Sequence, residues 1–283
     1  MSHAILLISC PDQKGITASV TRFVYENRGN IVHADQHIDD QSNIFFMRLE
    51  WDMEGFALSR EESFDAFKTV AREFSMEWQL FFTEDTLKVA IFVSRHLHCL
   101  NDLLLRQKAG HLRCDIPLII SNHAEAQEVA KDFGIKFVHL PVTSENKAQQ
   151  EIKQMALLKK HEISLVVLAR YHQILSENFV EQFKNRIINI HHSFLPSFPG
   201  RQPYAQAYEK GVKLIGAPCH YVTANLDEGP IIEQDTIRVS HRDSLADLVR
   251  QGEDIEKAVL SRSLRWALEH KILCYNNKTV VFD

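Results

Sequence analysis

Five short apolar runs in the middle of the chain constrain its fold more than any other feature. They have almost no alternating polar positions and are separated by longer polar stretches; they are Val89–Val93, Ile116–Ile120, Phe137–Val142, Leu165–Ala169 and Ile187–Ile190. A strand without polar alternation is buried on both faces, and strands that alternate with helices form a parallel sheet. We therefore expect a mostly parallel, doubly wound α/β domain over residues 85–283.

The first part of the chain has a different pattern. Apolar periodicity and turn residues predict the order β-α-β-β-α-β between Ala4 and Thr83, with a capping box from Ser59 to Glu62 before the second helix. This order is typical of a small antiparallel sheet with two helices on one face. We expect a ferredoxin-like α+β domain over residues 1–84, followed by a polar linker at 84–86.

Composition disfavours several classes of function. The 32 basic and 37 acidic residues leave a net charge of -5, and no Lys/Arg block is present, so we expect no nucleic-acid partner. No apolar run approaches the ~18 residues that span a bilayer, and the first residues lack the pattern of a signal peptide. The five cysteines are scattered and form no C-x-x-C pair, which favours reduced thiols. We therefore expect a cytoplasmic protein without a membrane partner.

Polar residues with catalytic chemistry lie at the end of the last of the five runs. Asn189 and His191 lie two positions apart, so on a strand their side chains share a face. Ligands of doubly wound sheets bind at the carboxyl ends of the strands, where a loop that contains Asp227 can return. An amide and an imidazole can stabilise an oxyanion that forms at a carbonyl. A carboxylate can orient water, accept its proton or hold the histidine in the required charge state.

Two purely structural interpretations of these residues stay open at this point. Asn189 and His191 could satisfy loop backbone at a strand end, and Asp227 could cap the turn before Gly229. A zinc site is disfavoured, because the histidines around His191 and His220 have no H-x-x-x-H or H-E-x-x-H spacing. We expect neither a metal nor a redox cofactor.

Motifs in the first domain resemble an ACT domain. They are Cys10–Ile16, Gly29–Ile31 and Asp35–Gln36. ACT domains commonly bind small amino acids or pair with one another. The resemblance therefore implies an amino-acid effector and a homo-oligomer, although a sheet that only dimerises would carry the same pattern.

Motifs in the second domain resemble the folate-dependent formyltransferase fold. They are Asn189–Pro196, Pro203–Tyr204, Gly216–Thr223 and Leu226–Pro230. The catalytic asparagine, histidine and aspartate of that family fall on Asn189, His191 and Asp227. Residues 170–175 match the loop whose backbone receives the pteridine ring. The resemblance thus implies a folate substrate bound by Arg170, Tyr171, His172, Gln173 and Ile174, with His220 and Thr223 as further candidates.

The loop after the first parallel strand bears on the formyl acceptor. Transferases of this fold that use glycinamide ribonucleotide hold its phosphate with a Gly/Ser/Asn-rich loop. The corresponding segment, Val93–Leu100, has bulky side chains and no glycine, so water becomes the expected nucleophile. His96, His98 and Cys99 in this segment are either site residues or part of a surface turn.

Both halves together make the whole chain resemble the formyltetrahydrofolate deformylases. These hydrolases convert 10-formyltetrahydrofolate and water into tetrahydrofolate and formate. The resemblance implies a place in one-carbon metabolism and a supply of formate for purine synthesis. Two alternatives stay open: a transferase that passes the formyl group to an amine, and a non-enzymatic sensor built on an inactive formyltransferase fold.

Overall fold

The computed structural model describes residues 2–192 and 203–283. The chain divides into two compact units. Unit 1 contains residues 1–86, 269–273 and 280–283, and unit 2 contains residues 87–268 and 274–279. Together they form an α/β protein of the expected kind, with an antiparallel sheet in the first unit and a mostly parallel sheet in the second.

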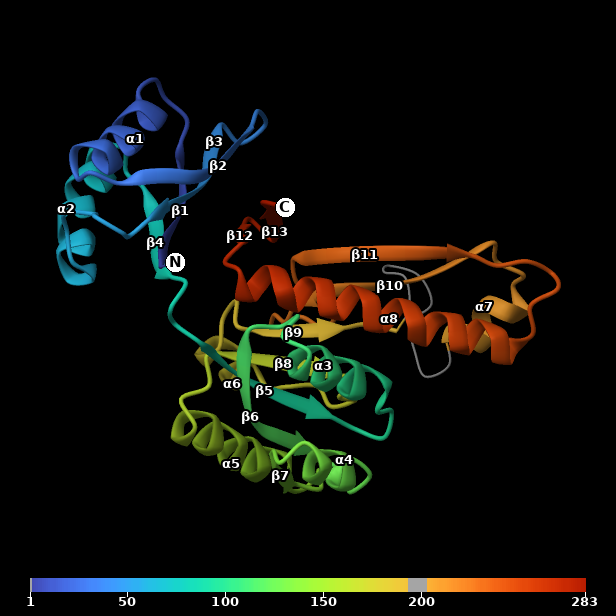
Figure 1. The fold of residues 1–283 in the computed structure, drawn as a ribbon. Helices are drawn as coiled ribbons and strands as arrows, with labels where there is room; N and C mark the ends of the chain where they lie inside the picture. The colour runs from blue at the N-terminus through green and yellow to red at the C-terminus, as the bar shows by residue number, and fades with distance from the viewer. Residues whose placement is uncertain (1, 193–202) are drawn as a thin grey trace. The chain divides into compact units, whose positions relative to one another are not determined.

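Unit 1 has the predicted β-α-β-β-α-β order. Its elements are β1 (His3–Pro11), α1 (Ile16–Glu26), β2 (Asn30–Asp39), β3 (Ile44–Asp52), α2 (Arg60–Glu73) and β4 (Glu77–Phe82). The strands pair antiparallel in the order β2-β3-β1-β4, as a ferredoxin-like fold requires (Figure 1). The predicted capping box begins α2, because the Ser59 hydroxyl accepts from the Glu62 amide while the Glu62 carboxylate accepts from the Ser59 amide. Both helices pack on one apolar core with β1 and β3.

The end of the chain adds a hairpin of two short strands, β12 (Ile272–Tyr275) and β13 (Lys278–Val281). Asn276 and Asn277 both have left-handed backbone, with φ of 42° and 59°, as a two-residue hairpin turn needs. Residues 269–273 belong to unit 1. There the buried Arg48 donates to the carbonyl oxygens of Glu269 and His270 at 3.2 and 3.1 Å.

Unit 2 has a seven-stranded sheet in the order β11-β10-β9-β8-β5-β6-β7. Its strands are β5 (Leu87–Val93), β6 (Cys114–Ser121), β7 (Lys136–His139), β8 (Leu165–Ala169), β9 (Ile187–Ile190), β10 (Leu214–Tyr221) and β11 (Ile231–Arg238). The first five are parallel, and β10 pairs antiparallel with β9 and β11. The expected strand to Val142 ends earlier, at His139, because Pro141 has no N–H with which to extend the ladder.

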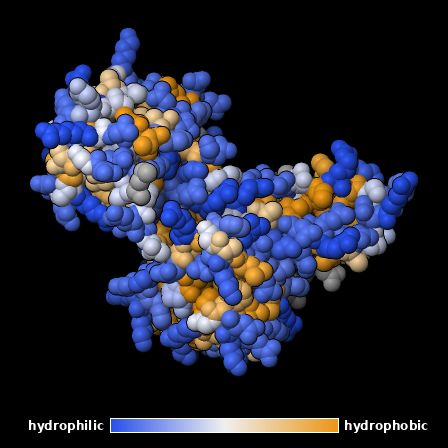
Figure 2. Space-filling view, in the orientation of Figure 1, coloured by the Kyte–Doolittle hydropathy of each residue, from blue (hydrophilic) through white to orange (hydrophobic). Residues whose placement is uncertain are grey.

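Six helices accompany this sheet in the described part of unit 2. They are α3 (His98–Lys108), α4 (Gln127–Asp132), α5 (Lys147–Lys160), α6 (Glu177–Gln182), α7 (Pro203–Glu209) and α8 (Leu245–Leu268). The longest, α8, begins with reciprocal bonds between Ser244 and Asp247 and packs along β9, β10 and β11 (Figure 1). Hydrophilic side chains dominate the visible surface in Figure 2, as expected when most apolar residues lie in the cores.

None of the described helices has the length and apolar character that a membrane crossing requires. All five cysteines are free thiols, and four of them are buried.

Candidate active site

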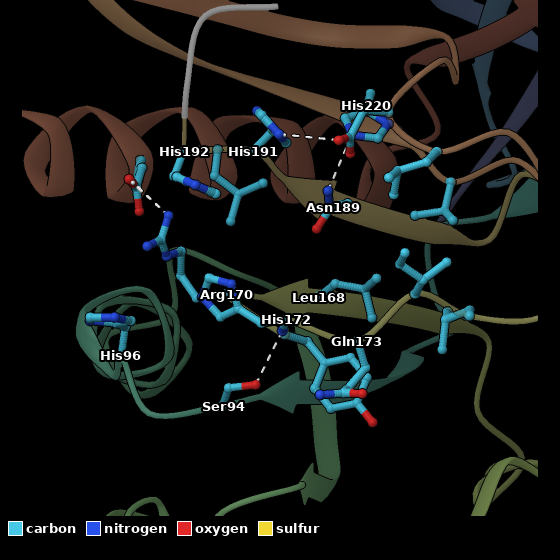
Figure 3. A pocket seen from close by; sticks show the side chains of 18 of the residues that line it. Ser94, His96, Leu168, Arg170, His172, Gln173, Asn189, His191, His192 and His220 are labelled. Atoms are coloured by element: carbon cyan, nitrogen blue, oxygen red, sulfur yellow. Dashed lines mark hydrogen bonds and ion pairs between the residues drawn. The ribbon is translucent and has the colours of Figure 1, made fainter. Parts of the chain in front are cut away.

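A cavity of about 910 Å³ opens in unit 2 at the carboxyl ends of the parallel strands (Figure 3). Ser94 directly follows β5, Arg170 follows β8, and His191 follows β9, and all three line the cavity. All ten residues that the sequence singled out lie on its wall: Arg170, Tyr171, His172, Gln173, Ile174, Asn189, His191, His220, Thr223 and Asp227. The structure therefore brings the three segments of the predicted site to one place.

The orientation of the Asn189 amide is fixed by a buried histidine. Antiparallel pairing of β9 and β10 places Asn189 opposite His220, whose side chain is 2% exposed. The Nδ1 atom of His220 lies 2.9 Å from the carbonyl oxygen of Tyr221, which can only accept, so Nδ1 carries the proton. The Nε2 atom must then accept from the Asn189 Nδ2 group at 3.1 Å. Burial lowers the pKa of His220, so the ring stays neutral in this arrangement.

Asp227 faces two histidines across the cavity. Its Oδ2 atom lies 3.2 Å from His191 Nε2, and its Oδ1 atom lies 3.8 Å from His220 Nε2. The hydrogen bond from His191 lowers the pKa of Asp227 by more than the partial burial of this carboxyl group raises it. Asp227 is therefore an ionised carboxylate at neutral pH that holds His191 Nε2 as a donor. Since 3.8 Å exceeds a hydrogen bond, Oδ1 is left to accept from a ligand or a water.

The loop that carries Asp227 is held close to β10. Asp227 has a left-handed backbone with φ of 56°, which aspartate tolerates better than most residues. Two residues later, a Cβ atom on Gly229 would lie 1.7 Å from the Tyr221 carbonyl oxygen, so this position requires glycine. The same carbonyl oxygen accepts from His220. One backbone carbonyl thus fixes both the loop and the histidine that orients Asn189.

The segment after β8 forms another part of the wall. The His172 amide donates to the Ser94 hydroxyl at 3.1 Å, and this hydroxyl donates to Asn122 at 2.7 Å, which ties the segment to the end of β5. Tyr171 points inward, because its hydroxyl accepts from the buried Gln154 at 3.0 Å. On the opposite side, the Thr223 hydroxyl donates to the Asn225 carbonyl and so holds the loop before Asp227.

Sequence reasoning missed Glu256, a fully buried carboxylate on α8 that lines the cavity. It accepts from the Tyr204 hydroxyl and from His98 Nε2, each at 2.7 Å, and from Arg170 Nη1 at 3.3 Å. Burial alone would raise its pKa, but these donors and the charge of Arg170 keep the pKa below the usual value. The only signal in the sequence was a glutamate on the apolar face of an otherwise amphipathic helix.

Burial excludes a surface turn for His98 and Cys99, although neither of them lines the cavity. His98 is 12% exposed and Cys99 is buried, so neither belongs to a surface turn. His96 lines the cavity. Within the described residues, His98, Cys99 and Glu256 form one group with metal-ligand spacing. The charge of Glu256 is already shared by Arg170 and its other donors, which makes this group a poor cation site.

A row of imidazole rings continues from Asp227 along the cavity wall. Ring centroids are 5.0 Å apart for His191 and His192, 5.8 Å for His192 and His172, and 6.0 Å for His172 and His96. Desolvation, and after it the charge of Arg170, lowers the pKa of His172 and of His192 to about 4 and also lowers the pKa of His96. These three rings are therefore neutral at pH 7. The motif continues into Ser193–Pro196, which lies outside the described residues.

Comparisons with known protein families cover both units. The formyl transferase family matches residues 87–264, and the ACT domain family matches residues 4–52. The chain is 55% identical to the formyltetrahydrofolate deformylase of Synechocystis sp. over 279 residues, which covers 99% of this chain and 98% of that protein.

Solved structures agree with these sequence matches. The crystal structure of a formyltetrahydrofolate deformylase from Pseudomonas syringae superposes with a TM-score of 0.98 at 46% identity, covering 100% of this chain and 95% of that one. A glycinamide ribonucleotide transformylase from Symbiobacterium toebii matches with a TM-score of 0.67 at 29% identity, over 72% of this chain and 98% of its own.

Proposed function

The chain belongs to the formyltetrahydrofolate deformylase family, and from this premise we propose that its cavity hydrolyses 10-formyltetrahydrofolate with Asn189, His191 and Asp227 as the catalytic groups. We assign these three residues because their side chains surround one cavity and are held in place there. Asn189 is oriented through His220, and His191 is oriented through Asp227. The reaction yields tetrahydrofolate and formate.

Asn189 and His191 supply the electrophilic side of this mechanism. An attack on the formyl carbon moves negative charge onto the formyl oxygen. The Asn189 Nδ2 group donates one of its two N–H bonds to His220 and can donate the second to this oxygen. The ionised Asp227 holds the ring of His191. In this mechanism the polar ring lies next to the same formyl oxygen. The fixed tautomer of His220 keeps the amide from rotating its acceptor oxygen toward the developing charge.

Asp227 is the general base of this mechanism. Its Oδ1 atom is free of the His191 contact and can accept from the attacking water. As the C–O bond forms, the proton of this water moves to Asp227 and then to the leaving N10 atom. Breakage of the C–N bond then releases the secondary amine of tetrahydrofolate and formic acid, which ionises to formate. These groups supply every proton that the hydrolysis moves, so we propose that no metal or redox cofactor takes part.

The walls of the cavity support a folate substrate and water as the nucleophile. We assign the pteridine ring to the space between residues 172–175 and the loop from Thr223 to Asp227, since both line the cavity. Ser94, Arg95 and His96 occupy the place after β5 where a phosphate-binding loop would need glycines. An amine acceptor that carries a phosphate has no cradle of backbone amides there.

The test is turnover in a buffer that contains no amine acceptor. Purified protein should convert 10-formyltetrahydrofolate into equal amounts of formate and tetrahydrofolate over many turnovers. Folate binding without turnover, relieved by an added amine, would assign the chain to the transferases. Folate binding without turnover under any condition would support the sensor alternative.

For unit 1 we propose an amino-acid effector site and assembly into a homo-oligomer. The ACT domain match and the ferredoxin-like sheet support both, because β2 lies at the sheet edge and can pair with another copy. A monomer in solution whose melting temperature does not change with glycine or methionine would contradict this proposal. We also propose a cytoplasmic location, since five free thiols fit a reducing compartment.

A further inference from the structure

Arg170 is a buried cation whose hydrogen bonds are incomplete. It follows β8 directly and has a left-handed backbone with φ of 62°, which side-chain-bearing residues rarely adopt. Its side chain lines the cavity and is 10% exposed. Its Nε atom is buried and finds no acceptor among the described residues. A buried charged donor without a partner is unfavourable unless a ligand or a water completes it.

Glu256 does not complete the coordination of this guanidinium. Its Oε1 atom is 3.3 Å from Arg170 Nη1 but accepts a shorter bond of 2.7 Å from Tyr204, and its Oε2 atom accepts from His98 at 2.7 Å. A guanidinium group has five N–H bonds, of which one finds an acceptor in the described part of the chain. The edge formed by Nε and the second terminal nitrogen is therefore the unsatisfied part.

The residues around this edge suit a small anion. In Figure 3, the guanidinium group of Arg170 lies on the side of the cavity where His96 and His192 are found. His96, His172 and His192 are neutral at pH 7 for the reasons given above, so each can donate one N–H without adding charge. The row of rings from His96 to His191 connects this part of the wall with Asp227.

We propose that the free edge of Arg170 binds a small carboxylate, and that this ligand is the formate released at Asn189, His191 and Asp227, an assignment that rests on the proposed function. A guanidinium edge matches the two oxygens of a planar carboxylate with two parallel N–H···O bonds. Formate is the smallest such anion, and hydrolysis generates it inside the same cavity. Transfer to Arg170 frees the position next to Asp227 for the next water.

The same chemistry would also hold the carboxylate of an amino acid that served as an amine acceptor. The test distinguishes formate from an amino-acid carboxylate as the ligand of Arg170. Full-length protein without folate is titrated with ¹³C-labelled sodium formate, and in parallel with glycine, at constant ionic strength, with binding followed by the NMR line width of the ligand. We expect saturable binding of formate and no competition by glycine.

Three variants locate the site. R170K keeps the charge but loses the planar edge, and we expect formate affinity to fall at least ~10-fold. E256Q removes the competing negative charge and should tighten formate binding. R250K changes an arginine on α8 that is 71% exposed and serves as the matched control with unchanged affinity. Because R170K and E256Q are expected to shift the affinity in opposite directions, a general loss of folding cannot produce the expected pattern.

Each contrary result has a defined meaning. The absence of saturable formate binding to the wild type, or equal affinity in R170K, overturns the inference while leaving the hydrolysis intact. Glycine binding that displaces formate overturns the assignment to product. Formate binding by a protein that produces no formate from 10-formyltetrahydrofolate refutes the proposed function, and with it the origin of the ligand.

Discussion

The substitution Gly229→Ala tests how the loop of Asp227 is held. A Cβ atom there would lie 1.7 Å from the Tyr221 carbonyl oxygen and 3.3 Å from His220 Nδ1, so the loop must retreat by more than about 1 Å. Asp227 is two residues away, and the displaced carbonyl is the one that fixes the His220 tautomer. A misplacement of about 1 Å near reacting groups costs roughly 100-fold in rate, or about 2.7 kcal/mol of transition-state stabilisation. We therefore expect kcat/KM to fall about 100-fold.

The assay quantifies formate and tetrahydrofolate at substrate concentrations below KM, together with thermal unfolding. Gly134→Ala is the matched control, because Gly134 has φ of 67° and a Cβ there meets nothing within 4 Å. Backbone strain of about 1–2 kcal/mol should lower the stability of G134A without changing its activity. A folded G229A protein with kcat/KM within about threefold of wild type would refute the reasoning. A loss of activity in G134A as large as that in G229A would refute it equally.

Three further predictions concern charge. Asp227→Asn should retain folate binding and lower kcat at least ~100-fold through loss of the base, measured by equilibrium binding and turnover; near-normal turnover would remove Asp227 from the chemistry. Arg48→Met removes a buried charged donor from two partly buried carbonyl oxygens and should lower the free energy of unfolding by about 2–4 kcal/mol in denaturant titrations; an unchanged midpoint would contradict this. Burial, assisted by neighbouring arginines, lowers the pKa of His192 and of His270 from 6.5 to about 4. Between these values the unfolded chain binds protons that the folded chain does not, so the free energy of unfolding should fall on acidification by up to about 1.4 kcal/mol per pH unit for each group; constant stability from pH 6.5 to 4.5 would contradict it.

The fold could be predicted from the sequence because its signals are local. An uninterrupted apolar run such as Leu165–Ala169 indicates a strand buried on both faces, and the structure has β8 at those residues. Asn276 and Asn277 marked the final hairpin because few other residues tolerate two left-handed positions in succession. The strand predicted to reach Val142 was wrong, since its apolar pattern outweighed the missing N–H of the proline within it.

That Asn189, His191 and Asp227 would meet at one cavity was predictable as well, because strand ends and motif spacing pointed to the same edge of the sheet. The orientation of these groups was not. It depends on a bond from His220 to a backbone carbonyl, and on a close approach at Gly229 that only the folded chain shows. The contacts of Glu256 could not be predicted from the sequence either, because its donors come from segments far apart in the chain.

The most direct test of the central claim is hydrolysis in water enriched in ¹⁸O. If the groups around Asp227 deliver water to the formyl carbon, each formate released in a single turnover should carry one ¹⁸O atom, and its amount should equal that of tetrahydrofolate. Unlabelled formate, or loss of the formyl group without free formate, would contradict the account, because the oxygen would then not come from water.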